Sequence, residues 1–119
     1  MKRILVTGSR DWDDISQIFN ILNHLMKRWG TNLIIVHGGA RGADTMAGQW
    51  AGVQFLQEEV HPADWDKYGK RAGFVRNAEM VALGADICVA FIKNNSKGAT
   101  ICADLAEKSG ILTLRVYRD

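Results

Sequence analysis

Short apolar runs alternate with amphipathic segments along the whole chain, and this alternation constrains the fold more than any other feature. Most of the runs are apolar without interruption, which is typical of strands buried on both faces of a parallel sheet. The segments between them repeat apolar residues at helical spacing. The expected strands cover residues 3–7, 33–37, a short part of 54–61, 86–92 and 111–117, and the expected helices cover 15–29, 43–51, 73–83 and 99–109.

Strands and helices that alternate in this way predict the α/β class. We expect a Rossmann-like doubly wound sheet of about five mainly parallel strands, in the order 3-2-1-4-5, with helices on both faces. A length of 119 residues suits a single domain over residues 1–119. Asp14 as an N-cap and Gly30 as a C-terminal stop should delimit the first helix.

The charge balance and the apolar runs exclude several classes of protein. The chain has 15 basic and 13 acidic residues, and this balance does not indicate a protein that coats DNA or a polybasic membrane anchor. No run has the length of a transmembrane helix, and the first residues lack the core of a signal peptide, so we expect a cytoplasmic protein with no membrane partner. Cys88 and Cys102 belong to no ligand cluster, so we expect two buried thiols and no metal site.

Three polar loops that contain glycine follow the first, second and fourth strands. In a doubly wound sheet, ligands bind at the carboxyl ends of the strands, near the point where the strand order reverses. The three loops should therefore meet at one edge, where backbone N–H groups, hydroxyls and two arginines would bind phosphate. The candidate ligand-binding residues in these loops are Gly8, Ser9, Arg10, Gly38, Gly39, Arg41, Gly42, Asp44, Ser96, Gly98 and Thr100.

A purely structural interpretation of these loops stays open. The glycines would then serve only tight turns, and Arg10 and Arg41 would be solvated. The loops contain neither the GxGxxG dinucleotide pattern nor the Walker A lysine pattern. A conventional NAD-dependent dehydrogenase and a P-loop ATPase are therefore disfavoured.

The helix expected at 73–83 adds polar groups to the same site. Arg76 and Asn77 interrupt an otherwise apolar helix face. An arginine that faces the cleft could bind a phosphate or a carboxylate through two hydrogen bonds. An ion pair with Glu79 or Glu58 is the alternative for Arg76, and the neighbouring lysines are expected at a solvated rim.

Two tryptophans lie near the predicted site. Trp12 follows the first loop, and Trp65 lies in the segment "PADW". Either side chain could stack on a nucleotide base through its aromatic face. Packing over the start of the first helix is the alternative for Trp12.

The combination of these segments resembles the SLOG superfamily, and within it the small single-domain group related to YpsA and YspA. The resemblance rests on "GSR", "GGARGAD", "PADW", "GKRAG", "RNAEM" and "GAT", and it runs over essentially the full chain. It implies a Rossmann-like domain that senses or processes nucleotides or their derivatives, commonly as a homodimer. The second loop is also similar to that of the DNA-processing protein DprA, which binds single-stranded DNA.

The LOG phosphoribohydrolases of the same superfamily cleave the N-glycosidic bond of nucleoside monophosphates with an arginine and a glutamate. Arg76 matches the arginine by position, whereas the glutamate position falls on Cys102 or Ala103. Glycoside cleavage through an oxocarbenium-like transition state needs a carboxylate beside the sugar. If the chain is an enzyme, the candidate catalytic residues are Arg76, from the resemblance, together with Asp44 or Asp104, the latter out of register with the family's glutamate. Asp44, at a helix start, could instead bond the N–H groups of its own loop or a ribose hydroxyl.

One function is favoured, with two alternatives. We expect a nucleotide-binding domain that senses or sequesters a nucleotide or an ADP-ribose-like molecule, with its phosphate held by the strand-end loops. The first alternative is a LOG-type nucleotide N-glycosidase. The second is DprA-like binding of single-stranded DNA, which the modest net charge disfavours.

Overall fold

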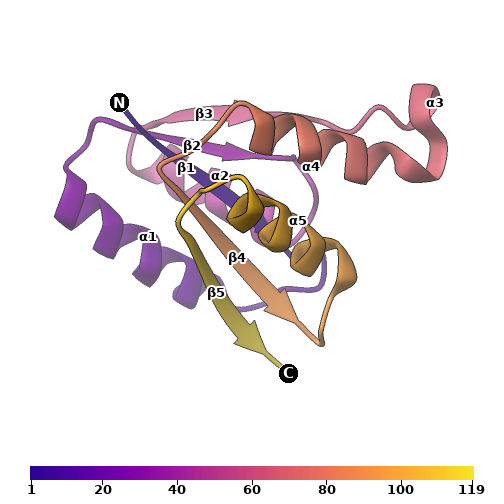
Figure 1. The fold of residues 1–119 in the computed structure, drawn as a ribbon. Helices are drawn as coiled ribbons and strands as arrows, with labels where there is room; N and C mark the ends of the chain where they lie inside the picture. Colours follow the sequence, from indigo (N-terminus) through magenta and orange to yellow (C-terminus); the bar gives the residue numbers. More distant parts are fainter.

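The computed structural model describes residues 1–119 and contains one sheet in the order β3-β2-β1-β4-β5 (Figure 1). All four neighbouring pairs are parallel. The predicted fold class and strand order are therefore confirmed. The strands are β1 (Lys2–Gly8), β2 (Leu33–His37), β3 (Gln57–Val60), β4 (Ile87–Lys93) and β5 (Thr113–Arg118).

Two helices pack on each face of the sheet (Figure 1). One face carries α1 (Ile15–Trp29) and α2 (Ala43–Val53), and the other carries α4 (Ala72–Ala82) and α5 (Lys97–Lys108). The first helix has its predicted ends. The Asp14 side chain accepts a hydrogen bond from the Gln17 N–H at 3.2 Å, and Gly30 ends the helix with a φ of 82°.

The polar segment before α4, where the sequence pattern predicts neither a strand nor a helix, contains two short helical turns. These are α3 (Trp65–Tyr68) and the 3₁₀ turn η1 (Gly69–Arg71), which lead directly into α4. The Asp64 side chain caps α3 by accepting a hydrogen bond from the Lys67 N–H at 3.1 Å. A helix of four residues is too short to show an apolar period, so sequence periodicity does not reveal it.

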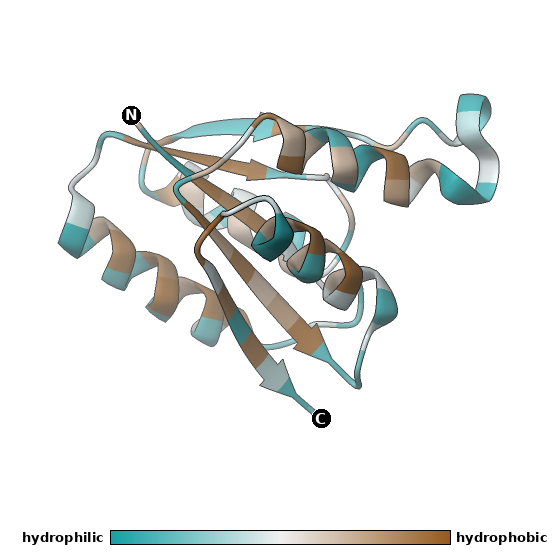
Figure 2. Cartoon of the chain, in the orientation of Figure 1, coloured by the Kyte–Doolittle hydropathy of each residue, from teal (hydrophilic) through white to brown (hydrophobic).

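The core has two parts, one on each face of the sheet. Ile4 and Val6 of β1 face α1 and α2, whereas Leu5 faces α4 and α5. Figure 2 shows this pattern as hydrophobic central strands between amphipathic helices. Cys88 and Cys102 are buried, unbonded thiols, as predicted. Burial raises the pKa of Cys88 to about 12 and also raises the pKa of Cys102.

The β3 edge of the sheet is hydrophilic (Figure 2) and is joined to β1 by an ion pair. The two guanidinium nitrogens Nη1 and Nη2 of Arg3 donate to the two carboxylate oxygens of Glu59 at 3.1 and 2.8 Å. His61 Nε2 lies 2.7 Å from the same carboxylate. Hydrogen bonds from Arg3 and His61 lower the pKa of Glu59 to about 2. No helix of this fold is both long enough and apolar enough to cross a membrane.

Candidate functional site

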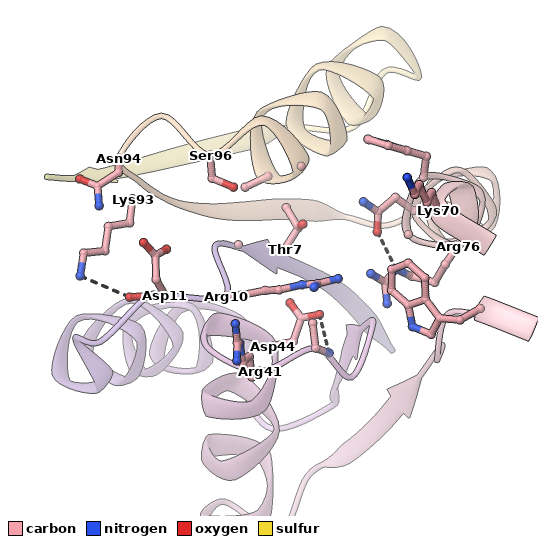
Figure 3. Close-up of a pocket in the computed structure, with 18 residues that line it drawn as sticks. Thr7, Arg10, Asp11, Arg41, Asp44, Lys70, Arg76, Lys93, Asn94 and Ser96 are labelled. Carbon is pink, nitrogen blue, oxygen red and sulfur yellow. Dashed lines mark hydrogen bonds between the residues drawn. The ribbon is translucent and has the colours of Figure 1, made fainter. Parts of the chain in front are cut away.

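A cavity of about 550 Å³ lies at the carboxyl ends of the strands (Figure 3). We call it the main cavity. The loops after β1, β2 and β4 contribute to it, together with α3, α4 and the start of α5. This is the edge at which the sequence predicts a ligand site. The predicted ligand residues that line the main cavity are Gly8, Arg10, Arg41, Asp44, Trp65, Arg76, Asn77, Ser96 and Gly98.

Cationic side chains outnumber acidic ones among the residues that line the main cavity. The only carboxylates among its lining residues are Asp11 and Asp44. No three histidine, cysteine, aspartate or glutamate side chains come together in a way that would hold a metal ion. The balance of charge therefore favours an anionic ligand. The cationic lining residues are Arg10, Arg41, Lys70, Arg76 and Lys93 (Figure 3).

Three of the predicted glycines bring the loops into contact with one another. A Cβ atom at Gly8 would meet the Ala43 side chain, and one at Gly38 would meet the guanidinium group of Arg76. Gly42 has a φ of 81°, and a Cβ atom there would meet backbone atoms of the first loop. By contrast, a Cβ atom at Gly98 would have no neighbour within 4 Å, so this glycine borders open space in the cavity.

The backbone N–H groups of the second loop are largely used within the loop itself. Gly38 and Ala40 both donate to Oδ2 of Asp44, at 3.1 and 3.2 Å. Gly39 donates to Nδ1 of His37 at 2.9 Å. The N–H groups of Gly38 and Gly39 are therefore not free donors in this structure, and binding of phosphate by this loop stays a prediction.

Asp44 organises the second loop and also reaches the main cavity. Its side chain is buried, and this burial raises its pKa, although the N–H groups of Ala40 and Gly38 and the charge of Arg76 oppose the shift. Its second oxygen, Oδ1, makes no hydrogen bond, and the structure contains no buried polar side-chain atom without a partner. Oδ1 is therefore accessible from the cavity and can accept a hydrogen bond from a ligand.

Arg76 is a nearly buried cation with no carboxylate partner. It is 9% exposed, and its Nε donates to Asn77 Oδ1 at 2.7 Å. Its Nη1 donates to the backbone carbonyls of Gly38 and His61, at 2.5 and 3.4 Å. Its Nη2 makes no hydrogen bond and is not fully buried, and the Arg76 side chain lines the main cavity.

The alternative interpretation of Arg76 as an ion-pair partner of Glu79 or Glu58 is wrong. Glu58 instead lies 2.6 Å from Nε2 of His37, and Glu79 makes no ion pair. Because Nδ1 of His37 accepts the Gly39 N–H, the proton of the neutral ring is on Nε2 and points at Glu58. Arg76 therefore makes no direct ion pair, although its charge acts on the Asp44 carboxyl, and it can bind an anionic ligand.

The start of α5 presents free N–H groups to the main cavity. Gly98 and Ala99 line the cavity, and their N–H groups have no backbone or side-chain partner. The N-cap residue Ser96 also lines it and makes no side-chain cap. Thr100, which the sequence predicts in the site, lies outside the lining, and its hydroxyl donates to the Ser96 carbonyl at 2.8 Å.

Two further predicted residues, Ser9 and Asp104, lie outside the cavity lining and have partners within the protein. Ser9 is 1% exposed, and its hydroxyl accepts the Lys93 N–H at 2.8 Å, which ties the end of β1 to the end of β4. Asp104 is exposed and accepts a hydrogen bond from Arg115 at 2.7 Å. The prediction of Asp104 as a catalytic candidate is wrong, because its carboxylate lines no cavity.

The two predicted stacking residues have different environments. Trp12 is 2% exposed, and its ring packs edge-on against Phe91 with 5.2 Å between ring centres. Its Nε1 donates to the Asp14 carbonyl at 2.9 Å, so Trp12 is a core residue and its predicted role in base stacking is wrong. Trp65 is half-exposed and lines the cavity, and the Arg10 guanidinium lies 5.6 Å from the centre of its ring.

Sequence reasoning missed several residues at the site. Thr7 and Asp11 flank the predicted loop after β1, and Lys93 precedes the predicted loop after β4, whose first residue Asn94 was not among the predicted binding residues. Lys93 donates to the Asp11 carbonyl at 3.3 Å and to the Asp13 carboxylate at 3.1 Å. These residues lie at the ends of strands, and that position could have indicated them. They were missed because the apolar pattern locates strand ends only to within a few residues.

Comparison with known proteins gives a family for this site and fold. The family model described as the YspA, cpYpsA-related SLOG family matches residues 2–68, which include the first two loops and Trp65. The Gene 61 protein of Mycobacterium phage D29 is similar to this chain, with 45% identity over 116 residues, which is 93% of each chain. No solved structure matches this chain. The chain therefore belongs to the YspA, cpYpsA-related SLOG family.

Proposed function

We propose that this protein binds a nucleotide or a nucleotide derivative in the main cavity and acts as a sensor or sequestering domain for it. The observation that carries the proposal is Arg76, a nearly buried cation that lines the main cavity, makes no ion pair and leaves Nη2 without a hydrogen-bond partner. A buried charge without a partner is costly, and a phosphate oxygen would supply that partner.

The groups around Arg76 support an anionic ligand that also carries a sugar. Arg10 and Arg41 line the same side of the cavity and make no hydrogen bond or ion pair with the protein. The free N–H groups at the start of α5 offer donors at the positive end of a helix. Asp44 Oδ1 offers an acceptor for a ribose hydroxyl. Phosphate would bind at the arginines and the sugar beside Asp44.

A thermal-shift screen tests the proposal. Purified protein is heated with mono-, di- and triphosphate nucleotides, NAD, ADP-ribose and cyclic dinucleotides. A ligand at 100 times its dissociation constant stabilises the folded state by about 2.7 kcal/mol. We expect at least one nucleotide to raise the Tm of the wild type, and to raise that of Arg76→Ala by less. A panel in which no nucleotide shifts the Tm would refute the proposal and favour a test of DNA binding as a function of salt.

A second function, hydrolysis of the nucleotide N-glycosidic bond, is supported by one observation. Asp44 places an unpartnered carboxylate oxygen in the main cavity, and burial raises the pKa of this carboxyl. A carboxyl with a raised pKa beside a sugar is the kind of group that glycoside hydrolysis requires. Chromatography of any ligand after incubation distinguishes the two functions. An intact ligand supports a binding domain, and a free base that Asp44→Asn no longer releases supports an enzyme.

The homodimer expected from the resemblance stays a prediction. Light scattering coupled to size-exclusion chromatography, with and without the best nucleotide of the screen, would give the number of chains in the particle.

A further inference from the structure

A second cavity, of about 490 Å³, adjoins the main cavity on its arginine-rich side, and we call it the side cavity. Both cavities are lined by Arg10, Ala40, Arg41, Trp65 and Arg76, which therefore form the boundary between them. The contact between the Arg10 guanidinium and the Trp65 ring, at 5.6 Å, is part of this boundary. Three guanidinium groups thus stand where the two cavities meet.

Beyond this boundary, the side cavity has no charged lining residue. Its remaining wall consists of Gly38, Gly39, Pro62 and Ala63. Small neutral residues suit an uncharged sugar or base, whereas guanidinium groups suit the oxygens of a phosphate. The distribution of charge therefore places phosphate at the boundary, with room for an uncharged group on either side of it.

Arg76 fixes the boundary in position. Hydrogen bonds from its Nη1 to the carbonyls of Gly38 and His61 hold the guanidinium between the second loop and the end of β3. Its Nη2 has no partner, and Arg76 lines both cavities. A phosphate at Nη2 would therefore be bound where a ligand passes from the main cavity to the side cavity.

We propose that the ligand is a two-part nucleotide, with a nucleoside in the main cavity, phosphate groups at the three boundary arginines, and a second sugar or nucleoside in the side cavity. This inference rests on the proposed function and assigns the ligand class of the same site. ADP-ribose and NAD have this two-part form, whereas AMP and ADP lack the second part. The two cavities are similar in volume and lie in the range of small-molecule sites.

The test blocks the side cavity alone. Ala63 lines the side cavity and not the main cavity, so Ala63→Leu fills the proposed second compartment. Ala82→Leu, at an exposed position near the end of α4 and outside both cavities, is the matched control. Calorimetric titrations with AMP, ADP, ADP-ribose and NAD give the affinities. The comparison of AMP with ADP gives the effect of an added phosphate, and the comparison of ADP with ADP-ribose gives the effect of an added sugar.

We expect the wild type to bind ADP-ribose or NAD roughly tenfold or more tightly than ADP. Ala63→Leu should reduce this affinity to that of ADP, and should leave the affinities for AMP and ADP unchanged. Ala82→Leu should behave as the wild type. If Ala63→Leu lowers the Tm of the free protein, the smaller change Ala63→Val repeats the test.

Two negative outcomes are distinguishable. If AMP and ADP bind, but no two-part ligand binds more tightly than ADP, then the two-part inference is overturned and the proposed function stands. The same conclusion follows if Ala63→Leu weakens all ligands equally. If none of the nucleotides binds to the wild type, the proposed function itself fails.

Discussion

The guanidinium group of Arg76 lies directly against the backbone of Gly38, and its Nη1 donates a hydrogen bond to the Gly38 carbonyl. A Cβ atom at residue 38 would meet Nη1, Cζ and Nε of this group. The glycine of the second loop and the arginine of α4 therefore depend on one another, although they lie on different elements. The absence of a side chain at Gly38 leaves the space that the guanidinium group of Arg76 occupies.

We expect Gly38→Ala to destabilise the protein and to weaken nucleotide binding at the same time. The added methyl group would displace the guanidinium, and overpacking of this kind costs about 1–3 kcal/mol. Urea unfolding and calorimetric titration measure the two effects. Gly52→Ala is the control: it lies in α2 with no atom within 4 Å of an added Cβ, so it should stabilise the helix by about 0.5–1 kcal/mol. A Gly38→Ala variant as stable as the wild type would contradict the proposed contact.

Arg41→Ala should weaken binding of the best nucleotide by roughly tenfold or more, the size of one charge-assisted contact. Arg41 lines both cavities and supports no other residue, so the Tm of the free protein should stay the same. Arg28→Ala, at the exposed end of α1, removes the same charge away from the site and should leave the affinity unchanged. Equal affinity of the wild type and Arg41→Ala would remove the second loop from the binding site.

Substitution of Trp12 should lower the stability of the protein, whereas substitution of Trp65 should lower its affinity for a nucleotide. Trp12→Ala removes a buried aromatic ring and its contact with Phe91, and we expect a loss of about 3–5 kcal/mol in the free energy of unfolding. Trp65→Ala should change stability by less than about 0.5 kcal/mol, because half of the side chain is exposed. Trp65→Ala should instead lower nucleotide affinity. Urea unfolding of both variants checks the contrast, and equal losses would contradict it.

The stabilising effect of Glu59 should depend on pH. Arg3 and His61 lower the pKa of this carboxyl to about 2, below its ordinary value. The stabilisation is therefore fully present above the unfolded-state pKa and is lost as the pH falls toward the folded-state pKa. The difference in stability between the wild type and Glu59→Gln should be largest near neutral pH and should shrink steadily in acid. Urea midpoints from about pH 6 to about pH 3 measure it.

Asp66→Asn is the control for this pH dependence, since Asp66 is exposed and has no ion pair. The stability of Asp66→Asn should change with pH in the same way as that of the wild type. A Glu59→Gln deficit that stays constant over the whole range would show that the ion pair with Arg3 does not stabilise the fold.

The apolar pattern predicted the architecture well because a strand that is buried on both faces is apolar at nearly every position. The uninterrupted apolarity of β4 indicated a central strand, and β4 pairs with β1 and β5. The site was predicted only in part, because a pattern locates loops and not the direction of each donor. The sequence left open whether Asp44 bonds the N–H groups of its own loop or a ribose hydroxyl, and only the structure shows that it accepts the N–H groups of Gly38 and Ala40. The burial of Trp12 likewise depends on Phe91, which is distant in sequence.

The packing of Gly8, Gly38 and Gly42 against neighbouring loops separates the frame of the site from its chemistry. These glycines set how closely the neighbouring elements approach, whereas a side chain at the rim of the cavity such as Arg41 makes no hydrogen bond or ion pair with the rest of the molecule. Such side chains can be exchanged one at a time without loosening the frame. Substitutions at the rim can therefore change which ligand binds, while the glycines keep the shape of the site.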